Sequence, residues 1–340
     1  MTLPRIAIAS LGGTISMTPD AAAGGVTPRL TAEQLAASVP GLAPVARITA
    51  ETLFQLPSAS LAFGNLVTAL NWAEQQVLAG AAGVVLTQGT DSIEETAFFL
   101  DLYWQRPQPL VVTGAMRAPM AAGADGPANL LAAVRTAAEP ASRQRGVLVV
   151  MNDTIHTARW VRKRHSLAVQ AFESPDAGPA GMVVEGSPHY FHAPAPRPPA
   201  MPAVVGDARV ALLETFLGDN GELADMVRTA GYHGLVIGGF GAGHVSFGYA
   251  ERIGPLCEAM PVVVASRAGA GRTATATYGY VGSEVDLVKR GALLAGWLCA
   301  RKARVLLWAL LAGGIAKADV AAAWQAWTAE GAGTARPPSG

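Results

Sequence analysis

The sequence predicts an α/β protein in which a larger N-terminal domain, built on a parallel sheet, precedes a smaller C-terminal α/β domain. Short apolar runs alternate with stretches of helical spacing, which is typical of mostly parallel sheets. Residues 192–202 (HAPAPRPPAMP) hold five prolines in eleven residues, which excludes a helix or a strand interior. We interpret residues 192–206 as a linker between domains at 1–191 and 207–330, with a tail at 331–340.

The predicted strands of the first domain are continuous apolar runs, as expected for strands buried on both faces. These runs are residues 6–11, 83–87, 109–113 and 146–151, and helical patterns cover residues 66–78, 92–104 and 129–138. The second domain has runs at 208–214, 234–238 and 261–266 and helical stretches at 303–312 and 318–328. This order favours a flavodoxin-like or Rossmann-like sheet, which binds ligands at the carboxyl ends of its strands.

Composition excludes several classes of function. The chain is 51% hydrophobic with 25 Lys+Arg against 25 Asp+Glu, so neither disorder nor binding to nucleic acid or an anionic membrane is indicated. Apolar stretches are interrupted before the ~18 residues of a membrane span, and the N-terminus lacks a secretory pattern. Cys257 and Cys299 have no metal or disulfide spacing, and His189 and His192 lack a third ligand. We therefore expect a cytoplasmic protein with no metal and no other cofactor.

The first strand leads directly into a glycine turn at residues 11–15 (LGGTI). Gly12 and Gly13 lack Cβ atoms, so the backbone can turn sharply there and a ligand can approach it closely. Thr14 then stands at a strand exit, where parallel sheets place ligands. Taken alone, this pentapeptide favours a simpler role for Thr14, as the N-cap of a helix.

A second polar loop, residues 87–92 (TQGTDS), follows the strand at 83–87. Residues 92–95 (SIEE) match a capping box, which predicts that a helix begins there with Ser92 as its cap. Thr90 and Asp91 would then lie beside a helix N-terminus, where the helix dipole favours negative charge and a developing oxyanion. Helix capping alone would not require the whole run of polar residues before it.

Several motifs, in the same order and spacing, resemble those of the bacterial L-asparaginase and glutaminase-asparaginase family. They are GGTI at 12–15, TQGTDSIEETAFFL at 87–100, TGAMR at 113–117, ADGPANL at 124–130, GVLVVMNDT at 146–154, SEVDL at 283–287 and ARKARVLLWALL at 300–311. The resemblance implies hydrolysis of L-asparagine to L-aspartate and ammonia through an acyl ester on threonine. It also implies a homo-oligomer, a dimer of dimers, whose sites are shared between subunits.

The resemblance also implies roles for individual residues. Thr14 matches the nucleophile, and Thr90 matches a second threonine that works with Asp91 and Lys163. Residues in or near the substrate pocket would be Ser58, which holds the substrate carboxylate, with Gln88, Gly89 and Ala115, and, at a neighbouring subunit's site, Glu284. His244 would lie at that same site, where it departs from the asparagine that some members have. Without the resemblance, Lys163 would be read as part of a solvated basic face, because it lies among arginines.

The sequence departs from the family in the loop after the glycine turn. Members usually have a tyrosine there that hydrogen-bonds the nucleophile, but residues 16–30 contain no tyrosine. We hypothesise that Tyr278 or Tyr280 supplies a substitute phenol. Ala59 and Ser60 stand where members often have glutamine and aspartate, a change that would bear on substrate preference.

Three alternatives to L-asparagine hydrolysis stay open. The first is a relative that prefers glutamine or D-asparagine. The second is an ammonia-supplying amidase subunit, which the few residues before the first predicted strand argue against. The third is a catalytically impaired amino-acid-binding protein, suggested by the missing tyrosine. Nucleotide binding at the glycine turn is disfavoured, because neither a G-x-G-x-x-G nor a Walker motif follows the first strand.

Overall fold

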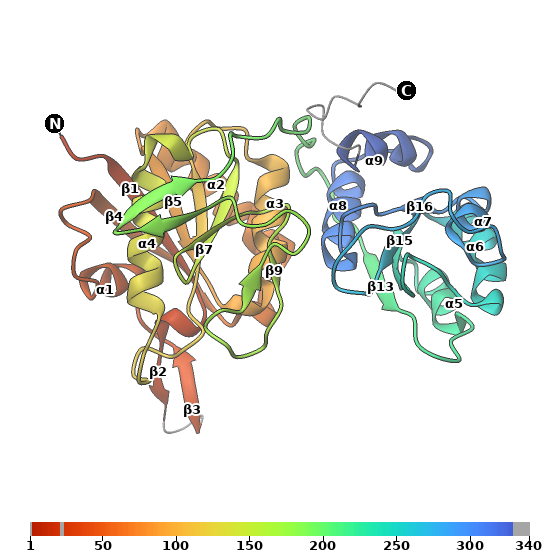
Figure 1. Cartoon of the computed structure of the whole chain (residues 1–340), viewed down its shortest axis with the longest axis horizontal. Helices are drawn as coiled ribbons and strands as arrows, with labels where there is room; N and C mark the ends of the chain where they lie inside the picture. Colours follow the sequence, from red (N-terminus) through yellow and green to blue (C-terminus); the bar gives the residue numbers. More distant parts are fainter. Residues whose placement is uncertain (1, 21–23, 329–340) are drawn as a thin grey trace. The chain divides into compact units, whose positions relative to one another are not determined.

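The chain divides into two compact units, Met1–Ala195 and Pro196–Gly340. The computed structural model describes residues 2–20 and 24–328 (Figure 1). Residues 193–209, which include most of the predicted linker, contain no helix or strand. The tail predicted at 331–340 lies outside the described residues.

The N-terminal unit is built on an eight-stranded sheet with the order β12-β11-β8-β7-β6-β5-β1-β4. Five neighbouring strands are parallel: β4 (Arg47–Leu56), β1 (Arg5–Gly12), β5 (Gly83–Thr87), β6 (Leu110–Thr113) and β7 (Val147–Met151). An antiparallel edge follows: β8 (Thr154–Thr157), β11 (Gly181–Val184) and β12 (Ser187–Tyr190). The predicted parallel sheet is therefore confirmed, with an added antiparallel edge.

Helices cover both faces of this sheet (Figure 1). One face packs against α1 (Ala32–Ala37) and α4 (Gly126–Ala138), and the other against α2 (Phe63–Leu78) and α3 (Ile93–Tyr103). Ile8, Val85 and Val111 are fully or almost fully buried against Leu130 and Val134 of α4. Because apolar side chains must be buried on both faces, these strands read as continuous apolar runs in the sequence.

Two short hairpins and several single turns complete the N-terminal unit. The hairpins are β2 (Met17–Asp20) with β3 (Gly25–Pro28), and β9 (Arg162–Lys163) with β10 (Phe172–Glu173). The 3₁₀ turns are η1 (Thr14–Ser16), η2 (Ser58–Ser60), η3 (Thr90–Ser92) and η4 (Pro140–Ser142). Three of these turns directly follow the carboxyl ends of β1, β4 and β5, which positions the site described below.

The antiparallel edge and β4 were not predicted from the sequence. The turn between β7 and β8 consists of Asn152 and Asp153, both with positive φ, at 49° and 56°. Two successive residues of this kind form the tight turn that returns a strand as a hairpin. In β4, exposed and half-buried residues alternate because it is the last strand of the sheet, so no continuous apolar run marks it.

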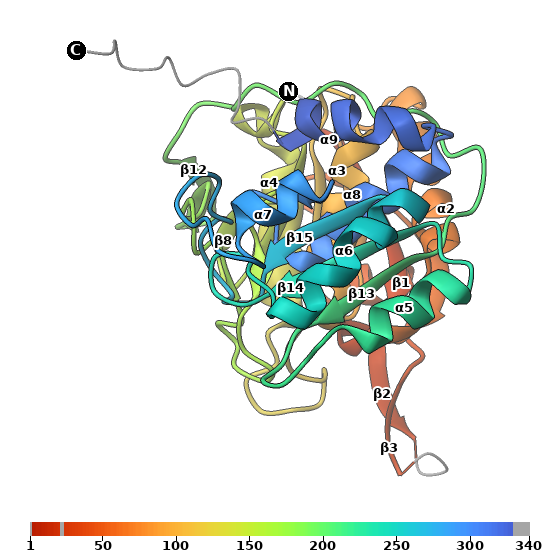
Figure 2. The same cartoon turned by 90° about the vertical axis from the view of Figure 1, so that its right-hand side faces the viewer.

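The C-terminal unit has a four-stranded parallel sheet of β13 (Val210–Glu214), β14 (Gly234–Gly239), β15 (Val262–Ser266) and β16 (Leu293–Leu294). In Figure 2, α5 (Glu222–Thr229), α6 (Phe247–Ala259) and α7 (Glu284–Lys289) lie in front of this sheet. The other face packs against α8 (Ala300–Ala312), which contacts α9 (Val320–Thr328) beyond the turn η5 (Lys317–Asp319). This arrangement confirms the smaller α/β domain predicted from the sequence.

Candidate active site

The loops that carry the predicted site residues meet at one edge of the N-terminal sheet. Because β4, β1, β5 and β6 are parallel and adjacent, their carboxyl ends lie side by side. Ser58 follows β4, Thr14 follows β1, and Thr90 follows β5. The sheet therefore brings together three residues that are well separated in the sequence.

Glycine backbones hold these three loops in close contact. A Cβ atom on Gly13 would lie 1.9 Å from the backbone nitrogen of Gly89, and Gly13 has φ +85°. A Cβ atom on Gly89 would lie 2.7 Å from Oγ of Ser58. Only glycine fits at these two positions, so the loop bearing Thr14 lies against the loop bearing Thr90, and the latter lies against Ser58.

Gly13→Ala is expected to lower the free energy of unfolding by about 3 kcal/mol, because the methyl group clashes with backbone and the positive φ is strained. The matched control is Gly64→Ala in α2, where a Cβ atom would meet nothing within 4 Å. That change should be neutral or stabilise by up to about 1 kcal/mol. Urea unfolding of both variants measures the difference, and equal effects would contradict the close packing.

Lys163 joins the two acceptors predicted for it. Its Nζ donates to Oγ1 of Thr90 at 2.9 Å and to Oδ1 of Asp91 at 2.7 Å. The lysine side chain is 13% exposed, whereas Asp91 is 71% exposed and so faces solvent or a ligand. The hydrogen bond from Lys163 is the main reason that the pKa of Asp91 lies below its ordinary value, with burial acting in the opposite direction. Lys163 is therefore not part of a solvated basic face.

Ser58 and Asp91 are hydrogen-bonded to each other. The backbone N–H of Asp91 donates to Oγ of Ser58 at 3.2 Å, and that hydroxyl donates to Oδ2 of Asp91 at 3.4 Å. The hydroxyl of Ser92 donates to the Ser58 carbonyl at 3.1 Å. Ser92 is the N-cap residue of α3, as predicted, but the side-chain bond of the capping box is not formed, because its hydroxyl bonds the neighbouring loop.

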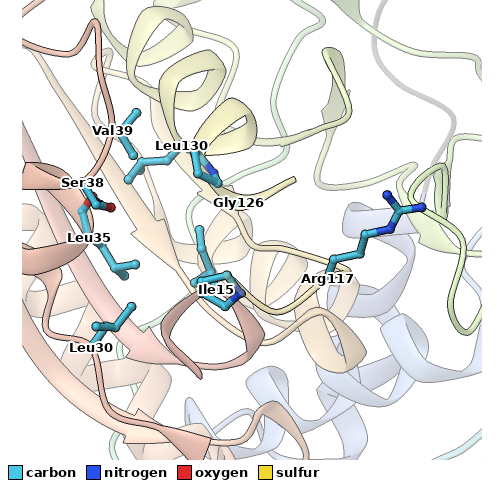
Figure 3. Close-up of a pocket in the computed structure, with 10 residues that line it drawn as sticks. Ile15, Leu30, Leu35, Ser38, Val39, Arg117, Gly126 and Leu130 are labelled. Atoms are coloured by element: carbon cyan, nitrogen blue, oxygen red, sulfur yellow. Dashed lines mark hydrogen bonds between the residues drawn. The ribbon is translucent and has the colours of Figure 1, made fainter. Parts of the chain in front are cut away.

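Thr14 is the first residue of η1, after its N-cap Gly13, so the interpretation of Thr14 as an N-cap is wrong. Within residues 2–20 and 24–328, its hydroxyl forms no hydrogen bond. Ile15, the next residue, is buried and forms part of an apolar pocket with Leu30, Leu35 and Leu130 (Figure 3). The buried Ile15 therefore anchors η1 directly beside Thr14.

Gln88 and Ala115 are fully buried, so their side chains do not form an open pocket wall in this structure. The Gln88 amide nitrogen donates to the Gly89 carbonyl at 3.2 Å and to Oγ of Ser92 at 3.4 Å. A Cβ atom on Gly126 would lie 3.4 Å from that of Ala115. These two buried residues pack against the site loops and support them.

The loop that carries Ala115 has a polar anchor that was not predicted from the sequence. The carboxylate of Asp125 accepts the backbone N–H groups of Met116 and Arg117, at 2.9 Å each at closest. Asn129 donates to the Gly114 carbonyl and to Asp125, both at 3.0 Å. A spacing of four residues at the start of a helix was the available signal for this pair, because it places both side chains on one face.

His244 and Glu284 come together with both candidate tyrosines in the C-terminal unit. Glu284 is fully buried, and its Oε1 accepts the backbone N–H groups of Thr277 and Tyr278 at 2.7 Å each. Its Oε2 lies 3.2 Å from Nε2 of His244, whose Nδ1 lies 2.8 Å from the Tyr280 hydroxyl. Burial alone would raise the pKa of Glu284, but the backbone donors and His244 hold that pKa below its ordinary value.

Over the part of the chain that the structure describes, no group of three or more His, Cys, Asp or Glu side chains is arranged to hold a metal ion. Over the same residues, no helix combines the length and the apolarity that a membrane crossing requires.

Comparison with known proteins identifies the family. The family model for the N-terminal domain of asparaginase matches residues 5–196, and that for the glutaminase/asparaginase C-terminal domain matches residues 209–323. This chain belongs to the asparaginase family. The resemblance found in the sequence motifs is therefore confirmed.

Individual asparaginases are similar over nearly the whole chain. A probable L-asparaginase of Deinococcus radiodurans is 38% identical over 94% of this chain and 96% of its own length. L-asparaginase 2 of Escherichia coli is 34% identical over 90% of this chain and 88% of its own. The crystal structure of a probable cytoplasmic L-asparaginase from Campylobacter jejuni, 32% identical, matches 94% of this chain and 99% of that one with a TM-score of 0.84.

Proposed function

We propose that this asparaginase-family protein is an L-asparaginase, which hydrolyses the side-chain amide of L-asparagine to give L-aspartate and ammonia. The observation that carries the proposal is the network in which Lys163 Nζ donates to both Thr90 and Asp91. The Gly13–Gly89 contact places the loop of Thr14 directly against this network. A hydroxyl, a lysine and a carboxylate in this arrangement fit nucleophilic amide hydrolysis.

In the proposed mechanism, Thr14 is the nucleophile of an acyl-enzyme pathway. Its Oγ attacks the amide carbon, and its proton passes through the Thr90–Lys163 pair to the leaving nitrogen, which departs as ammonia. Backbone N–H groups that follow Gly13 or Gly89 stabilise the tetrahedral oxyanion. Water then attacks the resulting ester, which releases aspartate and restores the threonine hydroxyl.

Substrate binding is assigned to the groups around this network. We propose that Ser58 donates to the substrate carboxylate and that the exposed carboxylate of Asp91 binds the substrate ammonium. The mutual hydrogen bonds of Ser58 and Asp91 support this pairing, since they place both groups side by side. On substrate binding, the single Ser58 hydroxyl proton would turn from Asp91 to the substrate carboxylate. Gly89, Gln88 and Ala115 contribute by shaping the backbone of the loops.

The C-terminal cluster is proposed to act at the site of another subunit. The buried carboxylate of Glu284 is held by His244 and by the backbone N–H groups of Thr277 and Tyr278. These contacts fix the orientation of the carboxylate. We propose that Glu284 and His244 complete a neighbouring subunit's site in a homotetramer, a dimer of dimers. We also propose a cytoplasmic location, which is supported by the description of the similar Campylobacter jejuni protein as cytoplasmic.

Tyr280 is the better candidate for the phenol that is missing from the loop after Thr14, because its hydroxyl is hydrogen-bonded to His244. Tyr280→Phe is expected to lower kcat by about tenfold or more, the scale of a lost proton-transfer partner. Tyr278→Phe is the matched control, because it keeps the backbone N–H that bonds Glu284. Steady-state ammonia release measures both variants, and normal rates in both would exclude a substitute phenol at these positions.

Substrate comparison tests the proposed function. We expect the kcat/KM for L-asparagine to exceed those for L-glutamine and D-asparagine. A glutamine preference is the main competitor, because a glutaminase-asparaginase of Pseudomonas aeruginosa is 40% identical over 57% of this chain and 55% of its own length. Absence of ammonia from all three amides, with aspartate still raising the Tm, would instead favour an amino-acid-binding protein.

A further inference from the structure

Glu94 is a buried carboxylate to which the proposed mechanism gives no role. It lies in the first turn of α3, only 2% exposed, three residues after Asp91 and four after Thr90. Residues at these separations lie on the same side of a helical segment. Glu94 therefore faces the same partner as the two residues that hold the Lys163 ammonium.

One partner of Glu94 is the backbone N–H of Lys163. Its Oε2 accepts the Lys163 N–H at 2.7 Å, the short distance typical of a charge-assisted hydrogen bond. Thr90 and Asp91 bind the far end of the same side chain at 2.9 and 2.7 Å. One short segment, residues 90–94, thus holds Lys163 at both ends.

The hairpin that carries Lys163 is tied to the rest of the N-terminal unit by individual side-chain contacts, and the one made by Glu94 falls on Lys163 itself. The strand β9 has two residues, and among the described strands it pairs with β10 alone, in a two-stranded sheet separate from the eight-stranded sheet. The buried ion pair of Arg162 and Asp176, at 3.0 Å, ties β9 to the residues that follow β10. Oγ of Ser174, in the same stretch, lies 2.9 Å from Nδ1 of His156 in β8. Glu94 ties the backbone of this hairpin to α3, and so to the loop of Thr90.

We propose that Glu94 is a positioning residue for the amide-hydrolysing site, which fixes the backbone from which Lys163 extends and thereby sets the ammonium between Thr90 and Asp91. The inference rests on the proposed function, because it assumes that Lys163 moves a proton in catalysis. The proposed role requires an oxygen at this position that accepts the Lys163 N–H. It does not require a negative charge.

The decisive experiment compares three substitutions at Glu94 by steady-state ammonia release. Glu94→Ala is expected to lower kcat about 10²-fold with a much smaller change in KM, the scale of a misplaced catalytic group. Glu94→Gln should recover most of the lost kcat, because its amide oxygen can accept the same N–H. Glu94→Asp should stay slow, because its carboxylate is one methylene short.

The pH profile separates positioning from simple loss of stability. Because the hydrogen bond from Lys163 is the main cause of the lowered pKa of Asp91, displacing the lysine raises that pKa. In the plot of kcat/KM against pH, the acid limb should therefore move to higher pH for Glu94→Ala. For Glu94→Gln the acid limb should stay in place. The control is Glu173→Ala, an exposed carboxylate on the same hairpin, which should change neither kcat nor the limb.

The outcomes distinguish the inference from the function on which it rests. A full rate in Glu94→Ala overturns the positioning role. If the alanine variant fails to fold, a Glu94→Gln variant as slow as Glu94→Asp overturns it. If Lys163→Met keeps the wild-type rate, the proposed mechanism falls together with the inference. If Lys163→Met is slow but the Glu94 variants are not, only the inference falls.

Discussion

Thr14→Ala is expected to lower kcat for L-asparagine by about 10⁴-fold or more, the scale of a lost nucleophile. The hydroxyl is placed at the sheet edge by two constraints that do not involve the oxygen itself. Before Thr14, Gly13 packs against Gly89, and after it, the buried side chain of Ile15 anchors the chain. Removing the hydroxyl should therefore leave the loop, and the unfolding free energy, nearly unchanged.

Two controls make this expectation specific. Thr14→Ser keeps a hydroxyl and should retain far more activity than Thr14→Ala. Thr18→Ala, in the adjacent strand β2, removes the same atoms from a position with no assigned role and should keep the wild-type rate. An active Thr14→Ala variant would overturn the nucleophile assignment, while loss of activity in Thr18→Ala would show that the region is merely sensitive to substitution.

Lys163→Met is expected to lower kcat by about 10³-fold, within the range of a lost general acid or base. The methionine keeps most of the aliphatic length but donates no proton, so Thr90 and Asp91 lose their shared partner. Ammonia release measures the rate, and circular dichroism establishes that the variant is folded. A variant that is folded and as fast as wild type would exclude Lys163 from proton transfer.

Lys163→Met should also change how the free energy of unfolding depends on pH. The pKa of Asp91 is lowered in the folded protein, so its ionisation stabilises the fold above the pKa of the unfolded chain. That contribution is lost as the pH falls through the folded-state pKa. The difference in unfolding free energy between wild type and Lys163→Met should therefore shrink on acidification through this range, as measured by urea unfolding at a series of pH values. A difference that does not depend on pH would contradict the pairing of Lys163 with Asp91.

The sequence predicted the parts of the fold that depend on local pattern. Apolar runs predicted the parallel strands β1, β5, β6 and β7, because burial on both faces leaves a continuous apolar signature. The edge strand β4 and the antiparallel β8 and β11 escaped prediction, because edge strands and short hairpins leave no such run. Family motifs, rather than periodicity, singled out Lys163.

What the sequence by itself determined about this protein is the family, the fold class and the strand exits at which Thr14 and Thr90 stand. These follow from residue order, from glycines that permit positive φ and from the period of the apolar pattern. Only the tertiary structure decided which groups meet: Gly13 against Gly89, the Ser92 hydroxyl bonded to Ser58 instead of forming the bond of the capping box, and Glu94 on the Lys163 backbone. Glu94 and Lys163 are 69 residues apart, and no local preference records where the chain returns, so such contacts appear only once the sheet and hairpin are packed.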